Sequence, residues 1–199
     1  KALVFHPDLM INTDLMRKIK DYTFFSYDVN EALHLSKRER ATINDCFEKI
    51  AYEIDQNIDK HSKTLIVSNI ELFLNYCMRF YDRQFITRTN VNKDILVRFE
   101  NLLNDYFKSD NAQTSGLPSV TFCAEELHLS PNYFGDLIKK ETGNTALDYI
   151  QTKLIDEAKS KIFDASKSIN DIANELGFKY QQHFTRKKKK KTGVTPNEY

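Results

Sequence analysis

The chain has 199 residues, and 29 Lys and Arg oppose 28 Asp and Glu, so its formal net charge at pH 7 is +1. No apolar run approaches the roughly 20 residues of a membrane-spanning helix, and no secretory signal pattern is present, so we expect no membrane partner. The low counts of five Gly and four Pro, together with long stretches of 3.6-residue apolar period, predict an all-α chain.

The cysteines and histidines predict neither a cofactor nor enzymatic activity. Cys46, Cys77 and Cys123 are odd in number and far apart, which argues against a disulfide framework or a zinc site and fits a reducing cytoplasm. The five histidines lack metal-ligand spacing, and neither a nucleophile triad nor a phosphate-binding loop is visible. We therefore expect no catalytic residues, no metal and no cofactor.

The first 35 residues give weak signals. Ala2–Phe5 is a short apolar run that is compatible with a terminal strand, and Pro7 follows it. Asp8 to about Asp21 favours a short helix. Residues 22–35 are aromatic-rich and less regular, and we expect their rings to pack in a core.

A helical hairpin is predicted over residues 36–83. Ser36 and Glu39 have the spacing of a capping box, and the helix that follows is expected to end near Lys60. A turn at His61 and Ser62 leads into a second helix that ends at about Arg83. The first helix is expected to bury one stripe of apolar residues, namely Ile43, Phe47, Ile50, Ile54 and Ile58.

A hairpin by itself cannot bury two wide apolar stripes. It needs either another domain or a second protomer, and the two are compatible. We favour a homodimer through residues 36–83. The polar stretch Gln84–Asn92 is interpreted as a linker, so that residues 1–91 form one region and residues 92–199 another.

The next region predicts a helix-turn-helix motif. Asn92–Lys108 has helical periodicity, and 109–118 is a loop by composition. A short helix and turn follow from about residue 120. Ser130 as N-cap and Pro131 at the first helical position then start a second helix, which Gly143 ends after Thr142.

A second copy of this pattern lies about fifty residues further on. Ala124–Leu127 aligns with Ala173–Leu176, and Phe134 aligns with Phe184. One residue is added near Gly177–Tyr180. The alignment also pairs, in the same order, Lys139, Lys140, Thr142, Gly143, Thr145 and Tyr149 with Lys189, Lys190, Thr192, Gly193, Thr195 and Tyr199. The sequence therefore predicts two similar helix-turn-helix units, at about 120–143 and 168–193.

One long helix, from Thr145 to about Asp164, is expected to join the two units. About twenty residues of helix span ~30 Å. Successive major grooves on one face of DNA are ~34 Å apart. The joining helix thus has the right length to seat both units in adjacent grooves.

These motifs resemble the DNA-binding domain of AraC/XylS-type bacterial transcription regulators over about residues 92–199. The matching stretches are LHLSPNYFGDLIKKETG in the first unit, and SINDIANELGFKYQQHFTR followed by TGVTPNEY in the second. The resemblance implies sequence-specific binding to double-stranded promoter DNA and possible contact with RNA polymerase. It also implies a preceding sensor barrel, whose last strand would be Ala2–Phe5 and which would bind any effector. The start at Lys1, not Met, is typical of a fragment.

The resemblance places base-facing positions on two recognition helices, at about 131–142 and 181–191. Asn and Gln side chains read adenine, Arg reads guanine, and Asp accepts from cytosine. Arg186 is the chief candidate for base readout, with a phosphate clamp as its alternative role, and Asp136 has a local salt bridge as its alternative. The full set of candidate DNA contacts is Asn132, Tyr133, Gly135, Asp136, Lys139, Gln181, Gln182, His183, Thr185, Arg186 and Lys189.

The second unit departs from the pattern at Lys187 and Lys188, which align with Leu137 and Ile138. Their positions predict burial, and unpaired lysines in a core are expensive, so these side chains must reach solvent or loosen the packing. They also extend a basic run from Lys179 to Lys191, which is either a phosphate-contacting surface or a solvated charge run. The alternative to a regulator is a helical dimerisation or scaffold protein with a non-specific basic patch.

Overall fold

The structure is a computed structural model that describes residues 2–162, 167–193 and 195–196. Within these ranges every regular element is a helix and no strand occurs, which confirms the all-α prediction. The chain divides into two units, residues 1–89 and 90–199. Within the described ranges, none of the helices has the length and apolar character needed to cross a bilayer.

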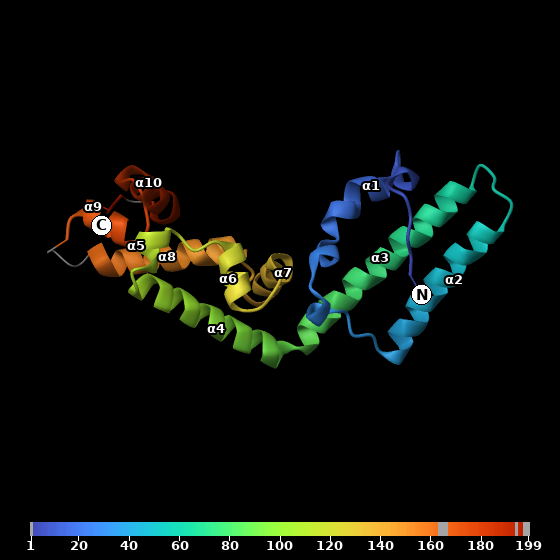
Figure 1. The fold of residues 1–199 in the computed structure, drawn as a ribbon, viewed down its shortest axis with the longest axis horizontal. Helices are drawn as coiled ribbons and strands as arrows, with labels where there is room; N and C mark the ends of the chain where they lie inside the picture. Colours follow the sequence, from blue (N-terminus) through green and yellow to red (C-terminus); the bar gives the residue numbers. More distant parts are fainter. Residues whose placement is uncertain (1, 163–166, 194, 197–199) are drawn as a thin grey trace. The chain divides into compact units, whose positions relative to one another are not determined.

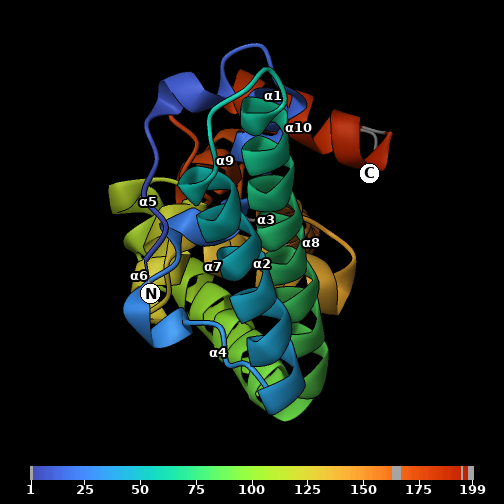
Figure 2. The ribbon, with the colours of Figure 1, turned by 90° about the vertical axis from the view of Figure 1, so that its right-hand side faces the viewer.

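The first unit is built on the predicted hairpin, in which α2 (Lys37–Asp55) and α3 (Ser62–Thr87) run antiparallel (Figures 1 and 2). The capping box is confirmed: the Ser36 hydroxyl accepts the Glu39 N–H at 3.3 Å, and the Glu39 carboxylate accepts the Ser36 N–H at 2.8 Å. The expected burial of Ile54 and Ile58 is wrong, since they are 61% and 90% exposed. Because α2 ends at Asp55, Ile58 no longer lies on a helical face.

Residues 2–31 cover one face of the hairpin. They form short helical segments, namely η1 (Pro7–Met10), α1 (Asp14–Lys18), η2 (Ile19–Asp21), η3 (Thr23–Ser26) and η4 (Val29–Glu31). Met10, Leu15 and Tyr22 enter the hairpin core, where they join Ile50, Val67, Ile70 and Leu74. The expected strand at Ala2–Phe5 is wrong: the segment has no regular secondary structure, and Leu3 and Phe5 pack against this core. The chain's own N-terminal segment thus covers much of the stripe that was expected to need another domain or a protomer.

The stretch 84–92, which its polar composition suggested to be a linker, is helical on both sides of a turn at Arg88. The helix α3 continues to Thr87, and α4 (Thr89–Lys108) starts after Arg88. Gln84 is buried, and its side chain bonds two backbone groups. Its Oε1 accepts the His34 N–H at 2.8 Å, and its Nε2 donates to the Ala32 carbonyl at 3.3 Å. The polar residues therefore hold the segment before α2 against α3.

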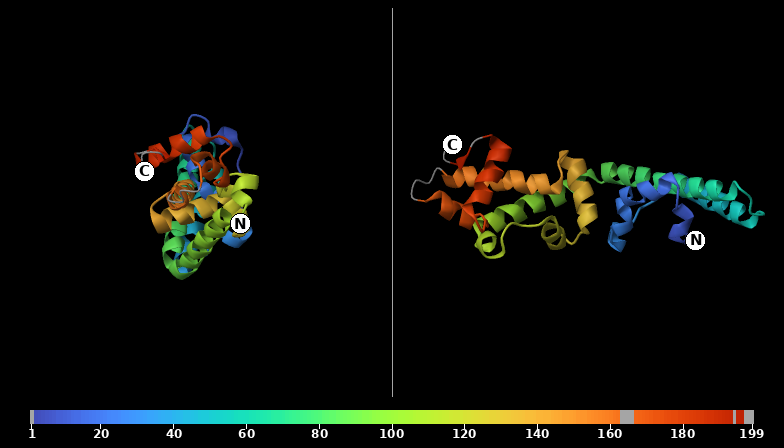
Figure 3. Two further views of the ribbon diagram at one scale, coloured as in Figure 1. Left: turned by 90° about the vertical axis from the view of Figure 1, so that its left-hand side faces the viewer. Right: turned by 90° about the horizontal axis from the view of Figure 1, so that it is seen from above.

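The second unit contains α4 and six further helices within its described residues (Figures 1 and 3). They are α5 (Asn111–Ser115), α6 (Val120–Glu126), α7 (Pro131–Thr142), α8 (Ala146–Ile162), α9 (Ile169–Glu175) and α10 (Gln181–Thr192). The pair α6–α7 lies near the start of α8 and α9 lies near its end, while α10 packs along α8 (Figures 1 and 3). The short helix α5 corrects the prediction that 109–118 is a loop.

The helix α4 supports the first pair through aromatic packing. The Phe99 ring lies in the core, 4.9 Å from the Phe134 ring on α7 and 5.3 Å from the Tyr149 ring on α8. Tyr149 also donates its hydroxyl to Glu100. Burial and the Glu100 carboxylate raise the pKa of Tyr149 to about 12, so the hydroxyl keeps its proton and remains a donor at neutral pH. α4 thereby fixes α7 relative to α8.

Ion pairs link α9 and α10 to α8. Glu175 accepts from Lys161 at 2.7 Å and from Lys167 at 2.5 Å, and these hydrogen bonds hold the pKa of Glu175 below its usual range. At the other end of α8, Asp148 accepts from Lys191 at 3.3 Å. The predicted end of this helix near Asp164 lies outside the described residues, which show helix up to Ile162.

The three cysteines are free thiols. Burial raises the pKa of Cys77 to about 11 and the pKa of Cys123 to about 12. Both thiols therefore stay protonated at neutral pH and pack as small apolar groups.

Candidate nucleic-acid interface

The first helix and the turn of the two units have the same backbone geometry. Both α6 and α9 have seven residues and begin at a serine N-cap, Ser119 or Ser168, whose hydroxyl accepts a backbone N–H three residues later. The turns that follow use corresponding hydrogen bonds at a residue spacing of 49: Leu129 N–H to Ala124 O and Phe178 N–H to Ala173 O at 2.9 Å, His128 N–H to Glu125 O at 2.9 Å, and Gly177 N–H to Asn174 O at 3.0 Å. The internal duplication predicted from the sequence is therefore present in the fold.

The second helices match as well, but at a spacing of fifty residues. Both α7 and α10 have twelve residues and end at a left-handed glycine, Gly143 with φ 74° and Gly193 with φ 81°. Because the turns match at 49 and the helices at 50, the added residue lies at Lys179–Tyr180, as the sequence predicted. The Ser130 hydroxyl caps α7, whereas Tyr180 supplies no side-chain cap to α10.

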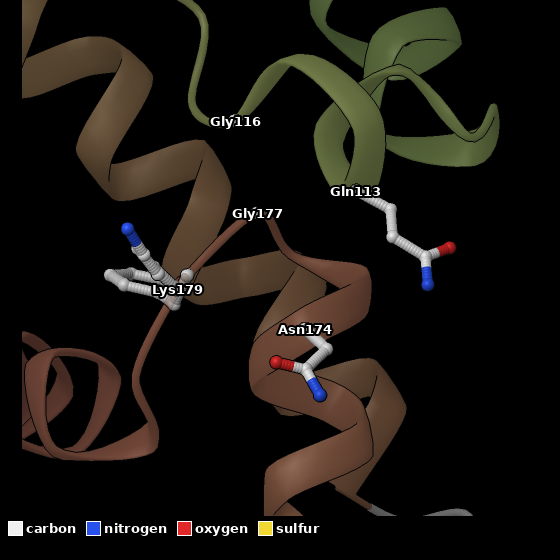
Figure 4. A pocket seen from close by; sticks show the side chains of 6 residues that line it. Gln113, Gly116, Asn174, Gly177 and Lys179 are labelled. Atoms are coloured by element: carbon white, nitrogen blue, oxygen red, sulfur yellow. The ribbon is translucent and has the colours of Figure 1, made fainter.

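The two turns each hold one residue in the left-handed region, and their surroundings explain its identity. His128 has φ 59° and is exposed, so a side chain is tolerated there. Gly177 has φ 85°, and a Cβ at this position would lie 2.5 Å from the Ala112 carbonyl oxygen and 2.9 Å from the Gly116 carbonyl carbon. Figure 4 shows this approach, with Gln113 of α5 and Asn174 of α9 beside it. Only glycine fits at 177 without displacement.

The exposed face of α7 carries most of the predicted contacts of the first unit. Asn132 and Lys139 are exposed, and Gly135 and Asp136 are half-buried beside them. The expectation that Tyr133 faces the DNA is corrected, since its side chain is only 4% exposed. At 100° per residue, Tyr133 falls in the same sector as the buried Leu137, so it belongs to the core side of the helix.

The corresponding face of α10 is more exposed and more basic. Thr185 is half-buried, and the other predicted contacts are exposed, namely Gln181, Gln182, His183, Arg186 and Lys189. With the fifty-residue spacing, the pairs of equivalent positions are Asn132 and Gln182, Gly135 and Thr185, Asp136 and Arg186, and Lys139 and Lys189. The two faces thus share an amide and a lysine but differ in charge at their third position.

The alignment predicted burial of both lysines at core positions; Lys188 is buried and does not reach solvent, whereas Lys187 is only half-buried. Lys188 is 0% exposed, and its Nζ donates to the Thr195 carbonyl at 3.3 Å. Lys187 is half-buried, with its Nζ 5.8 Å from the centre of the Phe178 ring. Burial and the nearby Lys191 lower the pKa of Lys187. The side chains therefore differ: Lys188 replaces a core residue, while Lys187 lies along an aromatic face.

Comparison with known proteins shows which family the chain resembles. A helix-turn-helix domain model matches residues 123–199. The chain is 24% identical over 148 residues to the HTH-type transcriptional regulator YtdP of Bacillus subtilis, a match that covers 74% of this chain and 19% of YtdP. It is 31% identical over 142 residues to the transposon Tn10 TetD protein of Escherichia coli, covering 71% of this chain and 90% of TetD.

The chain belongs to the AraC-type family of helix-turn-helix transcription regulators. Among solved structures, it resembles the C-terminal domain of the two-component response regulator yesN from Fusobacterium nucleatum, with 24% identity, 53% of this chain and 97% of that chain covered, and a TM-score of 0.47.

Within this AraC-type domain, the structure adds two polar residues that the sequence analysis did not select. Lys190 and Gln151 line a groove between α10 and α8, together with Phe178, His183, Arg186 and Lys187. Lys190 stands four residues after Arg186, so helical spacing alone could have placed it beside that residue. Gln151 comes from a different helix, and no local pattern in the sequence connects it to α10.

Proposed function

We propose that the chain is a sequence-specific regulator of transcription that places α7 and α10 in successive major grooves of promoter DNA. The observation that carries this proposal is the pairing of two structurally equivalent units with exposed polar faces. A scaffold protein would have no need for two matched exposed faces that carry amide and cationic side chains at equivalent positions.

The side chains suggest how the two helices divide the work. Asn132 and Gln182 present amides suited to adenine, and Arg186 presents a guanidinium suited to the O6 and N7 atoms of guanine. Asp136 has a carboxylate that accepts from the amino group of cytosine but repels phosphate. We therefore expect α10 to supply most of the affinity and α7 to contribute mainly discrimination.

The length of α8 supports simultaneous binding. Its 17 described residues rise about 25 Å. Because α7 and α10 both contact α8, this one helix sets the separation of the two recognition helices along DNA, whose successive major grooves are ~34 Å apart.

Arg186→Ala tests the proposal at its strongest side chain. We expect the affinity for a duplex selected from random DNA with the wild-type chain to fall about tenfold to a hundredfold, because a bidentate arginine–guanine contact contributes ~1–3 kcal/mol. Preference at one base pair should relax at the same time. Fluorescence anisotropy against the selected duplex and its single-base variants measures both effects.

Arg98→Ala, at an exposed arginine on α4, is the matched control and should leave affinity and preference unchanged. If the wild-type chain bound all duplexes equally and only salt concentration changed its affinity, the regulator proposal would fail. A helical scaffold protein with a basic patch would then be the better description.

We also infer that the hairpin, residues 36–83, forms a homodimer. Leu65 and Leu72 are 44% and 39% exposed and stand seven residues apart on α3, so they share one face. Neither belongs to the core that residues 2–31 cover. From the family we also expect contact with RNA polymerase and an effector bound by a preceding sensor region.

The double variant Leu65→Glu/Leu72→Glu is expected to convert dimers to monomers, because two carboxylates would lose their hydration in an apolar interface. Sedimentation equilibrium measures the change. Met16→Glu, at an exposed methionine of α1 in the same unit, should leave the dimer intact. A wild-type chain that sediments as a monomer at micromolar concentration would contradict the inference.

A further inference from the structure

The groove between α8 and α10 has a cationic lining that the two recognition faces do not explain. It has a volume of about 430 Å³, and Arg186, Lys187 and Lys190 reach it from α10. Gln151 lines it from α8, where its side chain is half-buried. Positive charge and an amide thus converge on one hollow from two helices.

The surroundings of the groove leave this positive charge available. One turn before Gln151, Asp148 accepts from Lys191, so that carboxylate is already engaged with a lysine outside the lining. The ammonium of Lys187 lies near Phe178, and its pKa is lowered by burial and by repulsion from Lys191. An anion in the groove would offset that repulsion.

The position of the groove indicates which part of DNA would reach it. A helix with its side chains is ~10–12 Å across and fills a major groove that is ~12 Å wide. With α10 seated there, side chains between α10 and α8 lie outside the stack of base edges. They face the wall of the groove, which is the sugar–phosphate backbone.

We propose that this groove holds one backbone phosphate of the bound DNA, contacted by Lys190 and by the side-chain amide of Gln151. The inference rests on the proposed DNA-binding function and adds a contact from α8, the helix that joins the two units. Lys187 completes the positive lining, and Arg186 remains free to turn toward the bases. The phosphate fixes the depth and angle at which α10 enters the DNA.

Salt dependence gives the first test, on the full chain with a duplex selected by that chain. Lys190→Gln is expected to reduce the slope of log K against log salt by about 0.9, the value for one phosphate contact. The affinity at 0.1 M salt should fall about five- to tenfold. Lys108→Gln, at an exposed lysine outside the groove, is the control and should keep the wild-type slope.

Substitution of single phosphates by neutral methylphosphonates gives the second test. At one position in the duplex, we expect the substitution to weaken binding by the wild-type chain but not by Lys190→Gln or Gln151→Leu. Equal sensitivity of all three proteins at every position, with an unchanged salt slope, would overturn the groove assignment.

The two proposals fail in different ways. A wild-type chain without sequence preference would refute the regulator, and the salt slopes on any duplex would still test the groove. A wild-type chain with normal preference whose groove variants bind like the wild type would refute the groove alone. Lys190 is exposed, so Lys190→Gln keeps the test valid if Gln151→Leu fails to fold.

Discussion

Replacing Gly177 with alanine is expected to destabilise the second unit by about 2–6 kcal/mol. Two costs add: a non-glycine residue at φ 85° is strained by roughly 1–3 kcal/mol, and overpacking typically costs about 1–3 kcal/mol more. The new Cβ would meet the Ala112 carbonyl oxygen at 2.5 Å, and this atom is backbone that cannot rotate away. Urea unfolding followed by far-UV circular dichroism measures the loss.

Gly143→Ala is the matched control for this prediction. Gly143 also has a positive φ, 74°, but a Cβ there meets nothing within 4 Å. Only the strain should remain, so we expect a loss of about 1–2 kcal/mol. Equal losses in the two variants would show that backbone strain alone decides, and that the close approach of α5 to the second turn has no energetic weight. The Gly177→Ala chain should also lose DNA affinity, because α10 follows directly from this turn.

Lys188→Met is expected to stabilise the second unit by about 1–3 kcal/mol. A buried charge is costly, and replacing buried ionic groups with apolar residues of similar volume is often stabilising by such amounts. Lys188 is 0% exposed, in a unit whose Ile172, Leu176 and Phe184 are also buried, while its equivalent in the first unit, Ile138, is apolar. A thermal melt should show the gain as a rise of roughly 4–8 °C per kcal/mol for a domain of this size.

The control here is Lys189→Met, one residue further along α10 and exposed, for which the change should stay within about 0.5 kcal/mol. A lower melting temperature for Lys188→Met would mean that the hydrogen bond from Nζ to the Thr195 carbonyl stabilises the fold more than an apolar contact would. The DNA affinity of the stabilised chain should rise, if instability of α10 limits binding.

Local signals predicted the second unit of the chain well, because its elements are bounded by residues with strong and specific preferences. Ser130, Pro131 and Gly143 set both ends of α7 correctly. The duplication then transferred this assignment to α10, where a capping side chain is lacking. The position of the extra residue in the second turn could likewise be read from the alignment alone.

The first unit was harder to predict because its contacts are long-range. The residues that cover the hairpin form short helices without a periodic apolar stripe. No sequence pattern therefore predicted that they pack on Ile70 and Leu74. A polar composition suggested a linker around Gln84, yet the side chain is polar because it bonds the backbone of His34. In each case the partner lies about fifty residues away.

The candidate interface shows the same limit. Helical spacing identified the exposed faces of α7 and α10, but Tyr133 was wrongly assigned to the outer face of α7, although it lies one turn from the buried Leu137 and is itself buried. Gln151 was missed because the groove exists only once α8 and α10 are packed together. Sequence patterns describe the face of one helix, and a site between two helices requires the fold.

The difference between Asp136 and Arg186, which stand at equivalent positions of the two units, gives the chain a direction. A protein whose halves carry opposite charges at the same place cannot recognise a palindrome with one copy of itself. The half-site read by each copy should therefore be asymmetric, with a left end and a right end. In the proposed homodimer, the orientation of one half-site relative to the other, as well as its sequence, would then decide whether both copies can bind.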